Sequence, residues 1–186
     1  MQMVKYYFML LNLTAIALLP ALTYADKLDE ICKKQLCRKP FTVSLQKQDG
    51  THFEMFFERV APIVSNGWIS VFPGETLYIE AEPQGQGLGN FRAVEKNSNP
   101  DKTLVFEFKQ DEGRADMLLK VHNPFDQELK FHTVMMLTDS DKMLKTSSCP
   151  VIATGDLFEH WPHEIFQLLF FEFKFLAKGA PMECKF

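Results

Sequence analysis

Apolar residues recur at every second position along most of the chain after residue 40, and this spacing limits the fold more than any other feature. A period of two turns one face of a strand toward a core and the other toward solvent. The pattern covers residues 41–46, 52–58, 104–108, 115–121 and 129–137, and residues 68–72 and 76–82 are two further expected strands. The pattern predicts an all-β protein.

Short turn sequences separate these strands. They are Asp49-Gly50, Pro73-Gly74, Glu112-Gly113, Asn123-Pro124 and the stretch Asp139 to Asp141. The first of them is a type I′ turn signal, which favours a tight hairpin between residues 41–46 and 52–58. Short strands with such punctuation predict an antiparallel β-sandwich of about eight to ten strands, and we expect residues 41–186 to form one domain.

Two segments depart from the alternation. Residues 26–40 are charged, and Leu28, Ile31 and Leu36 fall at helical spacing, so we expect a short N-terminal helix or turn there. The stretch Pro83 to Asn90 is rich in glycine and predicts a flexible loop between strands. Its G-x-G-x-G spacing differs from the G-x-G-x-x-G of dinucleotide-binding proteins, and no strand-helix pattern surrounds it.

The densest apolar segment is Ile165 to Leu176 near the end of the chain. Within it Phe171, Phe173 and Phe175 alternate with charged residues, which predicts a strand with the three rings on one face. Such a strand would pair with other copies if exposed, so we expect it at the centre of a sheet.

The first 25 residues have the form of a secretory signal peptide. Lys5 gives the positive start, Tyr6 to Leu19 an apolar stretch, and Pro20 to Ala25 a cleavage region before Asp26. We therefore expect a periplasmic or secreted protein whose mature part begins near Asp26. No later apolar run reaches the roughly 20 residues that a membrane-spanning helix needs.

Export changes how the four cysteines are interpreted, because disulfides persist in oxidising compartments. Cys32, Cys37, Cys149 and Cys184 allow three pairings, among which the sequence cannot choose. We favour Cys32 with Cys37, which closes a small local loop, and Cys149 with Cys184, which would hold the C-terminal segment. Structural disulfides are favoured over redox chemistry because the spacing Cys-x4-Cys is not the Cys-x-x-Cys of thiol oxidoreductases.

The charge distribution excludes some partners. The chain has a formal net charge of −4, and its basic residues are scattered apart from Lys33, Lys34, Arg38 and Lys39. Nucleic-acid binding depends on clustered Lys and Arg, so we expect no nucleic-acid partner. The sequence leaves the oligomeric state open, and no pattern in it calls for a cofactor.

The histidines provide weak candidates for a metal site. His160 and His163 are three residues apart and separated by Pro162, whereas the zinc-protease motif needs a step of four on an uninterrupted helix. A blue-copper site would need one cysteine, two histidines and an axial methionine, and Cys149, His160, His163 and Met182 supply those types at loose spacing. Surface histidines in a connecting loop are the alternative reading.

Catalytic motifs do not stand out either. There is no G-x-S-x-G nucleophile turn, and Ser147 and Ser148 fit hydroxyls that satisfy backbone groups at a strand end. An enzyme would have to use residues that these patterns do not reveal, so we expect a non-enzymatic protein.

Aromatic residues in expected loops are candidates for partner contact, since such residues are enriched at binding surfaces. The candidates are Trp68, Phe158, Glu159, Trp161 and His163. The alternative for each is ordinary packing, and Trp161 beside Pro162 would then close one end of the sandwich.

The stretch Leu119 to Asp126, followed by Leu129 to Val134, resembles a strand-turn-strand of immunoglobulin-like modules in exported bacterial proteins. The resemblance lies in an apolar-x-Val-x-Asn sequence that ends one core strand. Pilus-type periplasmic chaperones are similar over about twenty residues, but their two-domain form and basic anchor residues have no counterpart here. The mature chain is also similar to uncharacterised exported bacterial proteins. The resemblance implies an immunoglobulin-like sandwich and carries no functional residue across.

The function expected from these observations is an exported, disulfide-bonded interaction or envelope-associated module, with an exported protein as a possible partner. One alternative is a periplasmic chaperone or assembly factor that binds clients along a free sheet edge. The other is a metal-binding protein centred on the loop histidines.

Overall fold

The structure is a computed structural model that describes residues 28, 30–59 and 61–186. The expected signal peptide, residues 1–25, lies outside the described residues. The strands are β1 (Cys37–Arg38), β2 (Phe41–Gln46), β3 (His52–Phe57), β4 (Ala61–Pro62), β5 (Val64–Ser65), β6 (Trp68–Val71), β7 (Glu75–Gln84), β8 (Gly87–Val94), β9 (Thr103–Gln110), β10 (Met117–Asn123), β11 (Leu129–Met136), β12 (Met143–Thr146), β13 (Gly155–Trp161) and β14 (Gln167–Phe175). A short 3-10 helix, η1 (Pro100–Lys102), precedes β9. The expectation of an antiparallel all-β protein is confirmed.

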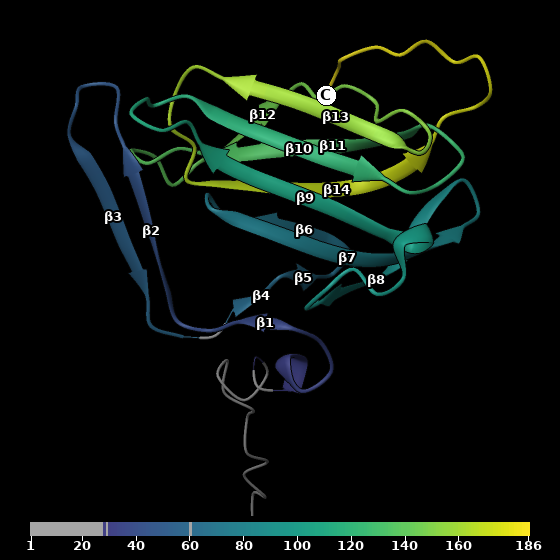
Figure 1. The fold of residues 1–186 in the computed structure, drawn as a ribbon, viewed down its shortest axis with the longest axis horizontal. Coiled ribbons are helices and arrows are strands. Elements are labelled where there is room, and N and C mark those ends of the chain that lie inside the picture. Colours follow the sequence, from purple (N-terminus) through teal and green to yellow (C-terminus); the bar gives the residue numbers. More distant parts are fainter. Residues whose placement is uncertain (1–27, 29, 60) are drawn as a thin grey trace, which may run out of the picture.

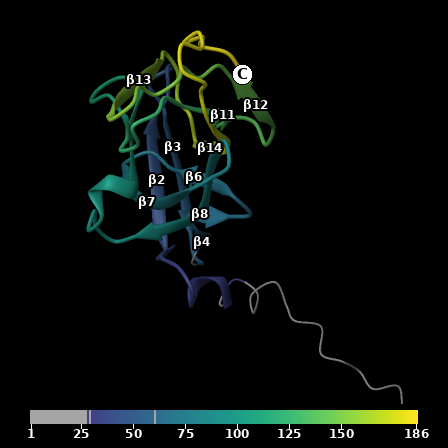
Figure 2. The same ribbon diagram turned by 90° about the vertical axis from the view of Figure 1, so that its right-hand side faces the viewer.

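Ten strands form one continuous antiparallel sheet, which has two halves. The first half-sheet has the order β8-β7-β9-β10-β13, and the second has β6, β14, β11 and β12, with β5 beside β6. A single pair, Lys174 with Gly87, joins the two halves through β14 and β8. The sheet bends sharply there, and its halves face one another (Figures 1 and 2).

Phenylalanine side chains fill the space between the halves. Phe106 of β9 lies 4.9 Å from Phe170 of β14 and 6.5 Å from Phe131 of β11, measured between ring centroids. All three are buried and belong to one contiguous core that extends from β2 to β14. Burying each ring stabilises the fold by about 1.5–3 kcal/mol.

The β2–β3 hairpin closes one end of this core (Figure 1). Val43 and Leu45 of β2 are 1% exposed, as the period of two predicts. The hairpin forms its own two-stranded sheet. The hairpin is linked to β9 through the side chain of Gln110. Its Oε1 atom accepts from the backbone nitrogen of Gln46, and its Nε2 atom donates to the backbone oxygen of Gln46, both at 2.8 Å.

A disulfide between Cys32 and Cys37 closes the N-terminal segment, where residues 30–32 form one helical turn. The short helix or turn expected there is present. β1 follows directly and pairs with β4, which places the segment against the edge of the domain.

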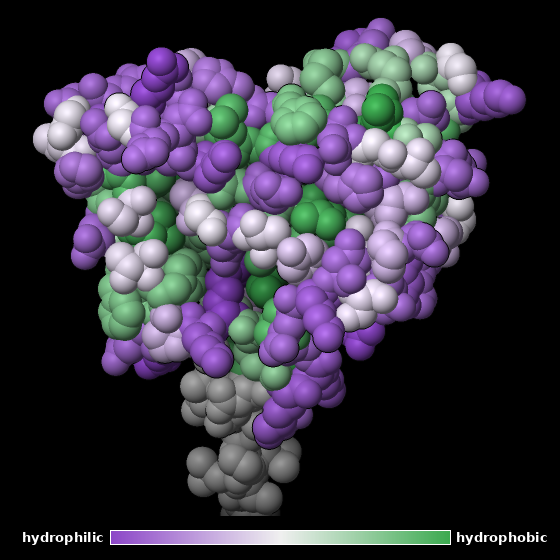
Figure 3. Space-filling model, viewed as in Figure 1, coloured by the Kyte–Doolittle hydropathy of each residue, from purple (hydrophilic) through white to green (hydrophobic). Residues whose placement is uncertain are grey.

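The second disulfide joins Cys149 to Cys184, so both favoured pairings are present. It holds the segment after β14 against the residues that follow β12, where Ser148 and Lys185 form an isolated bridge. The Ser148 hydroxyl donates to the Phe131 carbonyl oxygen at 2.8 Å, the backbone-satisfying role expected of it. Hydrophobic side chains gather around this C-terminal segment and around the β2–β3 hairpin on the face seen in Figure 3.

The prediction of a flexible loop at Pro83 to Asn90 is wrong. This stretch forms the tip of a hairpin in which β7 and β8 pair closely, as Gln84 with Gly87 and Pro83 with Leu88. Glycine serves close approach here: a Cβ at Gly87 would lie 2.2 Å from the backbone oxygen of Phe173. Glycine in a strand marks such a contact as readily as it marks a loop.

The prediction that Phe171 shares a face with Phe173 is also wrong. A bulge in β14 sets Glu172 and Phe173 opposite the single residue Phe131, and Glu172 has φ of 53°. The extra residue reverses the alternation. Phe173 is therefore buried, while Phe171 points to the outer face of the second half-sheet.

None of the helices in the described chain has the length and hydropathy required to cross a bilayer.

Candidate functional site

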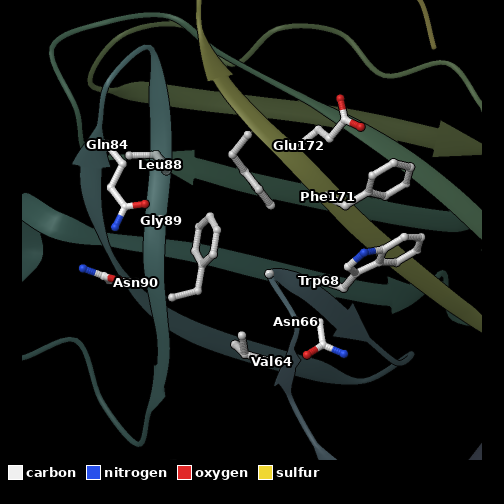
Figure 4. Close-up of a pocket in the computed structure, with 12 residues that line it drawn as sticks. Val64, Asn66, Trp68, Gln84, Leu88, Gly89, Asn90, Phe171 and Glu172 are labelled. Atoms are coloured by element: carbon white, nitrogen blue, oxygen red, sulfur yellow. The ribbon is translucent and has the colours of Figure 1, made fainter.

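A groove of about 630 Å³ opens on the outer face of the protein between the β5–β6 turn, the β7–β8 hairpin and β14. Figure 4 shows Trp68 and Phe171 on one side of it and Gln84, Gly89 and Asn90 on the other. Its volume lies within the roughly 300–1,000 Å³ range of small-ligand sites.

The groove exists because β14 changes its partner on one side. Residues Leu168, Leu169 and Phe170 pair with β6, whereas Lys174 pairs with β8. Between them, over residues 171–173, neither strand is paired with β14 on that side among the described residues. The strands β6 and β8 diverge at this point and leave the groove between them.

Trp68 and Phe171 form its aromatic side. Their ring centroids are 4.2 Å apart and their planes differ by 10°, so the rings are stacked. Trp68 is 37% exposed. Leu168 and Phe170 face the core, so Phe171 between them and the bulge faces outward, and the bulge at Glu172 returns the next ring, Phe173, to the core.

The position of Trp68 follows from the turn before it. Asn66 and Gly67 both have positive φ, 51° and 78°, and connect the paired residues Ser65 and Trp68. Asn-Gly with two left-handed residues is the pattern of a type I′ hairpin turn. The turn places the Asn66 side chain beside the indole at the mouth of the groove (Figure 4).

The opposite side of the groove carries amide side chains from the β7–β8 hairpin. The Gln84 amide lies over Gly89, where a Cβ would come within 2.1 Å of its Oε1 atom. Asn90 sits at a bulge of β8 with φ of 50° and donates from Nδ2 to Glu82 at 2.8 Å. Glycine at position 89 thus leaves the space that the Gln84 amide occupies.

The groove has little net charge. None of its described lining residues is basic, and its one acidic residue is Glu172. Lys174 Nζ lies 3.0 Å from the Glu172 carboxylate, and this hydrogen bond and charge lower the pKa of Glu172. Glu172 is thus ionised at neutral pH with a cation beside it.

The aromatic surface continues away from the groove across β11. His132 lies opposite Phe171 in the strand register, with ring centroids 5.6 Å apart. Phe186 of the C-terminal segment packs on His132 at 4.8 Å, and Lys145 Nζ lies 4.3 Å from the Phe186 ring. The rings of Trp68, Phe171, His132 and Phe186, which we call the aromatic row, cross three strands.

The other expected contact residues lie elsewhere. Phe158, Glu159 and Trp161 belong to β13, at the edge of the first half-sheet, and His163 lies in the bend after it. They are thus in a strand and its end rather than in a loop, and Trp68 does not join them. Phe158 is 72% exposed on the outer face.

Glu159 points inward and holds the backbone. Its Oε1 atom accepts from the Cys149 nitrogen at 2.7 Å, while its buried Oε2 atom has no hydrogen-bond partner among the described residues. Burial raises the pKa of Glu159, opposed by the Cys149 hydrogen bond and the charge of Lys130. Burial also lowers the pKa of Lys130.

Trp161 is 8% exposed and packs in the core against Phe108. Its indole Nε1 donates to Thr146 Oγ1 at 3.1 Å, which links β13 to β12. These contacts match the packing alternative for this residue.

The histidines expected as weak metal candidates are not gathered with other ligands. His160 Nε2 lies 3.4 Å from an Asp116 oxygen. Within residues 28, 30–59 and 61–186, no three His, Cys, Asp or Glu side chains are placed to hold a metal ion.

Of the groove residues, Trp68 is a contact candidate from the sequence, whereas Phe171, Gln84, Asn90 and Asn66 are not. The Asn66-Gly67 dipeptide is a turn signal that would have placed Asn66 beside Trp68. Nothing in the sequence pattern predicts the bulge that separates the faces of Phe171 and Phe173.

Comparisons of the chain with protein-family models, with curated proteins and with solved structures find no match.

Proposed function

We propose that the protein is an exported, disulfide-bonded binding module that captures its ligand in the groove between β6, β8 and β14. The observation that carries this proposal is the stacked Trp68–Phe171 pair on the outer face of the sheet. Large aromatic rings held partly in solvent are costly to leave uncovered, and they are enriched where proteins bind partners. Amide side chains opposite them supply hydrogen-bonding groups that fix orientation.

Rigidity of the site supports the same proposal. The turn at Asn66-Gly67 and the bulges at Asn90 and Glu172 set the positions of the groove side chains through the backbone. A preformed site loses little conformational entropy when it binds.

Binding to the cell envelope tests the proposal. Purified protein without residues 1–25, and its Trp68→Ala and Phe171→Ala variants, are mixed with envelope fragments and sedimented. The parent protein should sediment with the fragments, and both variants should stay in solution with thermal unfolding unchanged. Phe158→Ala, an exposed aromatic on the other half-sheet, is the matched control. Equal sedimentation of parent and groove variants contradicts the proposal.

Export is part of the proposal, and the two disulfides support it because they persist in an oxidising compartment. Cell fractionation with N-terminal mass analysis tests it. A mature chain that starts near Asp26 outside the cytoplasm is expected, and an uncleaved cytoplasmic chain contradicts export.

We also propose that the two facing half-sheets are an immunoglobulin-like sandwich. Asn123 supports this, because it ends the stretch that resembles such modules and is fully buried. Its side chain donates to the Gln127 and Ile152 oxygens and accepts from the Phe125 nitrogen, so it holds the turn after β10. An experimental strand order that differs from that of immunoglobulin-like modules would contradict this part.

A second candidate function is client binding along a sheet edge. It is favoured by β13, which pairs with β10 over seven residues and has no strand on its other side in the described chain. A client strand could add there. Phe158→Asp should then lose binding of one exported β-rich client that the Trp68→Ala variant still binds. Loss of the client in Trp68→Ala but not in Phe158→Asp would exclude binding along the β13 edge.

A further inference from the structure

We infer that the groove binds an uncharged glycan chain, an inference that depends on the proposed function because it names the ligand class of the same site. Three features support this ligand class: the charge of the groove, its mixture of hydrogen-bonding groups, and the length of the aromatic row.

The charge of the groove excludes strongly charged ligands. No described lining residue is basic, and the carboxylate of Glu172 is neutralised by Lys174 at 3.0 Å. An anionic polymer such as a nucleic acid or a sulfated polysaccharide would find no cation in the groove itself. A cationic peptide would find a single acid that is already paired.

The hydrogen-bonding groups opposite the rings are amides. Asn66, Gln84 and Asn90 each offer two donor hydrogens and an acceptor oxygen. One Asn90 donor is committed to Glu82, and the space above Gly89 keeps the Gln84 amide in place. Groups that both donate and accept match hydroxyls, which do the same, better than they match the carbonyl acceptors of an extended proline-rich peptide.

The rings suit the apolar face of a sugar. A pyranose ring presents a face of C–H bonds, with its hydroxyls directed sideways, and C–H groups are attracted weakly to the negative face of an aromatic ring. Trp68 and Phe171 are stacked and cover one face of each other, so the surface left for a sugar beside the amides lies mainly on Trp68, which is 37% exposed. One sugar unit can contact the indole and the amides together.

The aromatic row extends this surface beyond the groove. Trp68, Phe171 and His132 stand on three adjacent strands, which are about 4.8 Å apart in a sheet, and Phe186 lies on the far side of His132. A ligand that follows the row is a chain rather than a single sugar. Longer oligosaccharides should therefore bind more tightly than a disaccharide.

Calorimetric titration of the disulfide-bonded protein with cellohexaose, maltohexaose and chitohexaose tests the inference. At least one of these probes should bind, with the corresponding disaccharide at least tenfold weaker. Trp68→Ala should weaken binding of the hexasaccharide at least tenfold. Phe158→Ala, the exposed aromatic outside the groove, should leave it unchanged.

Two further variants separate the amide contribution from folding. Gln84→Ala and Gly89→Ala should each weaken binding about threefold to tenfold, the loss of one neutral hydrogen bond, because the new methyl of Gly89→Ala displaces the Gln84 amide. Phe186→Ala should weaken the hexasaccharide and leave the disaccharide unchanged. All variants should keep the parent thermal unfolding midpoint within a few degrees.

Three results would overturn the inference. They are no binding to any of the three probes, binding that Trp68→Ala leaves intact, or binding of a proline-rich peptide in place of the sugars. If the groove variants still lose envelope binding in those cases, the groove keeps its proposed function and only the glycan class is wrong. If the groove variants bind the envelope as the parent does, the proposed function itself fails.

Discussion

The guanidinium of Arg38 grips the carboxylate of Glu75 at both oxygens, from Nε at 2.5 Å and from Nη2 at 2.7 Å. Its remaining donors reach the Pro62 and Ser70 oxygens, so the buried cation, 7% exposed, is fully satisfied. Glu75 in turn accepts from the Phe72 nitrogen. One ion pair thus joins the N-terminal segment to β6 and β7.

Arg38→Ala should lower the free energy of unfolding by about 3–5 kcal/mol, because it leaves Glu75 without its partner in a largely buried site. Urea unfolding measures the loss. Arg114→Ala is the control: that side chain is 70% exposed, 3.8 Å from Asp116, and should cost less than about 1 kcal/mol. Equal losses would show that the Arg38 pair is no stronger than a surface contact.

The two disulfides should differ in their contribution. Cys149 and Cys184 are 35 positions apart and Cys32 and Cys37 only 5, so loop-closure entropy predicts about 4 and about 2 kcal/mol, respectively. Paired Cys→Ser variants, unfolded in urea, measure both values. A larger loss from the short loop would contradict the entropic explanation.

Glu159→Gln should flatten the dependence of stability on pH above 4.5. The pKa of Glu159 is raised from its ordinary 4.5 by burial, so the native state keeps a proton that the unfolded state releases. The free energy of unfolding therefore falls as pH rises from 4.5 through the raised pKa of Glu159 in the native state. Carboxylates with a lowered pKa, such as Glu80, change the stability of the protein only at pH values below 4.5. Thermal unfolding between pH 4.5 and 7 should favour the variant increasingly, and parallel profiles would contradict this.

Gly87→Ala should destabilise the protein by about 2 kcal/mol or more, because its Cβ would overlap the Phe173 backbone where the half-sheets join. Gly89→Ala is the matched control, since its Cβ meets only the movable Gln84 side chain. Thermal unfolding should separate the two variants clearly. Similar midpoints would show that the junction yields easily.

The strands were predictable where the period of two holds without interruption. In β2, Val43 and Leu45 face the core as expected, because one buried face suffices to set the register. A turn also forms at Asp49-Gly50, with Gly50 at φ of 81°, but it is not the expected type I′ turn, because Asp49 has no positive φ.

The groove was not predictable because tertiary contacts reverse local patterns there. At Glu172 a single bulged residue places Phe171 and Phe173 on opposite faces, although the alternation of Phe171, Phe173 and Phe175 indicates one shared face. Gly87 looked like part of a loop, because the contact that requires glycine there is with the backbone of Phe173, which lies far along the chain. Neither the bulge at Glu172 nor the contact of Gly87 with Phe173 can be predicted from sequence periodicity.

The attachment of the β2–β3 hairpin through the Gln110 side chain has a dynamic consequence. Because no backbone ladder ties the hairpin to the ten-stranded sheet in the described chain, it can swing away while every pair of that sheet stays intact. Such partial opening needs less free energy than global unfolding. The amide protons of β2 and β3 should therefore exchange with solvent before those of β9, and each opening would briefly bare the phenylalanine rings of Phe72 and Phe166 beneath the hairpin.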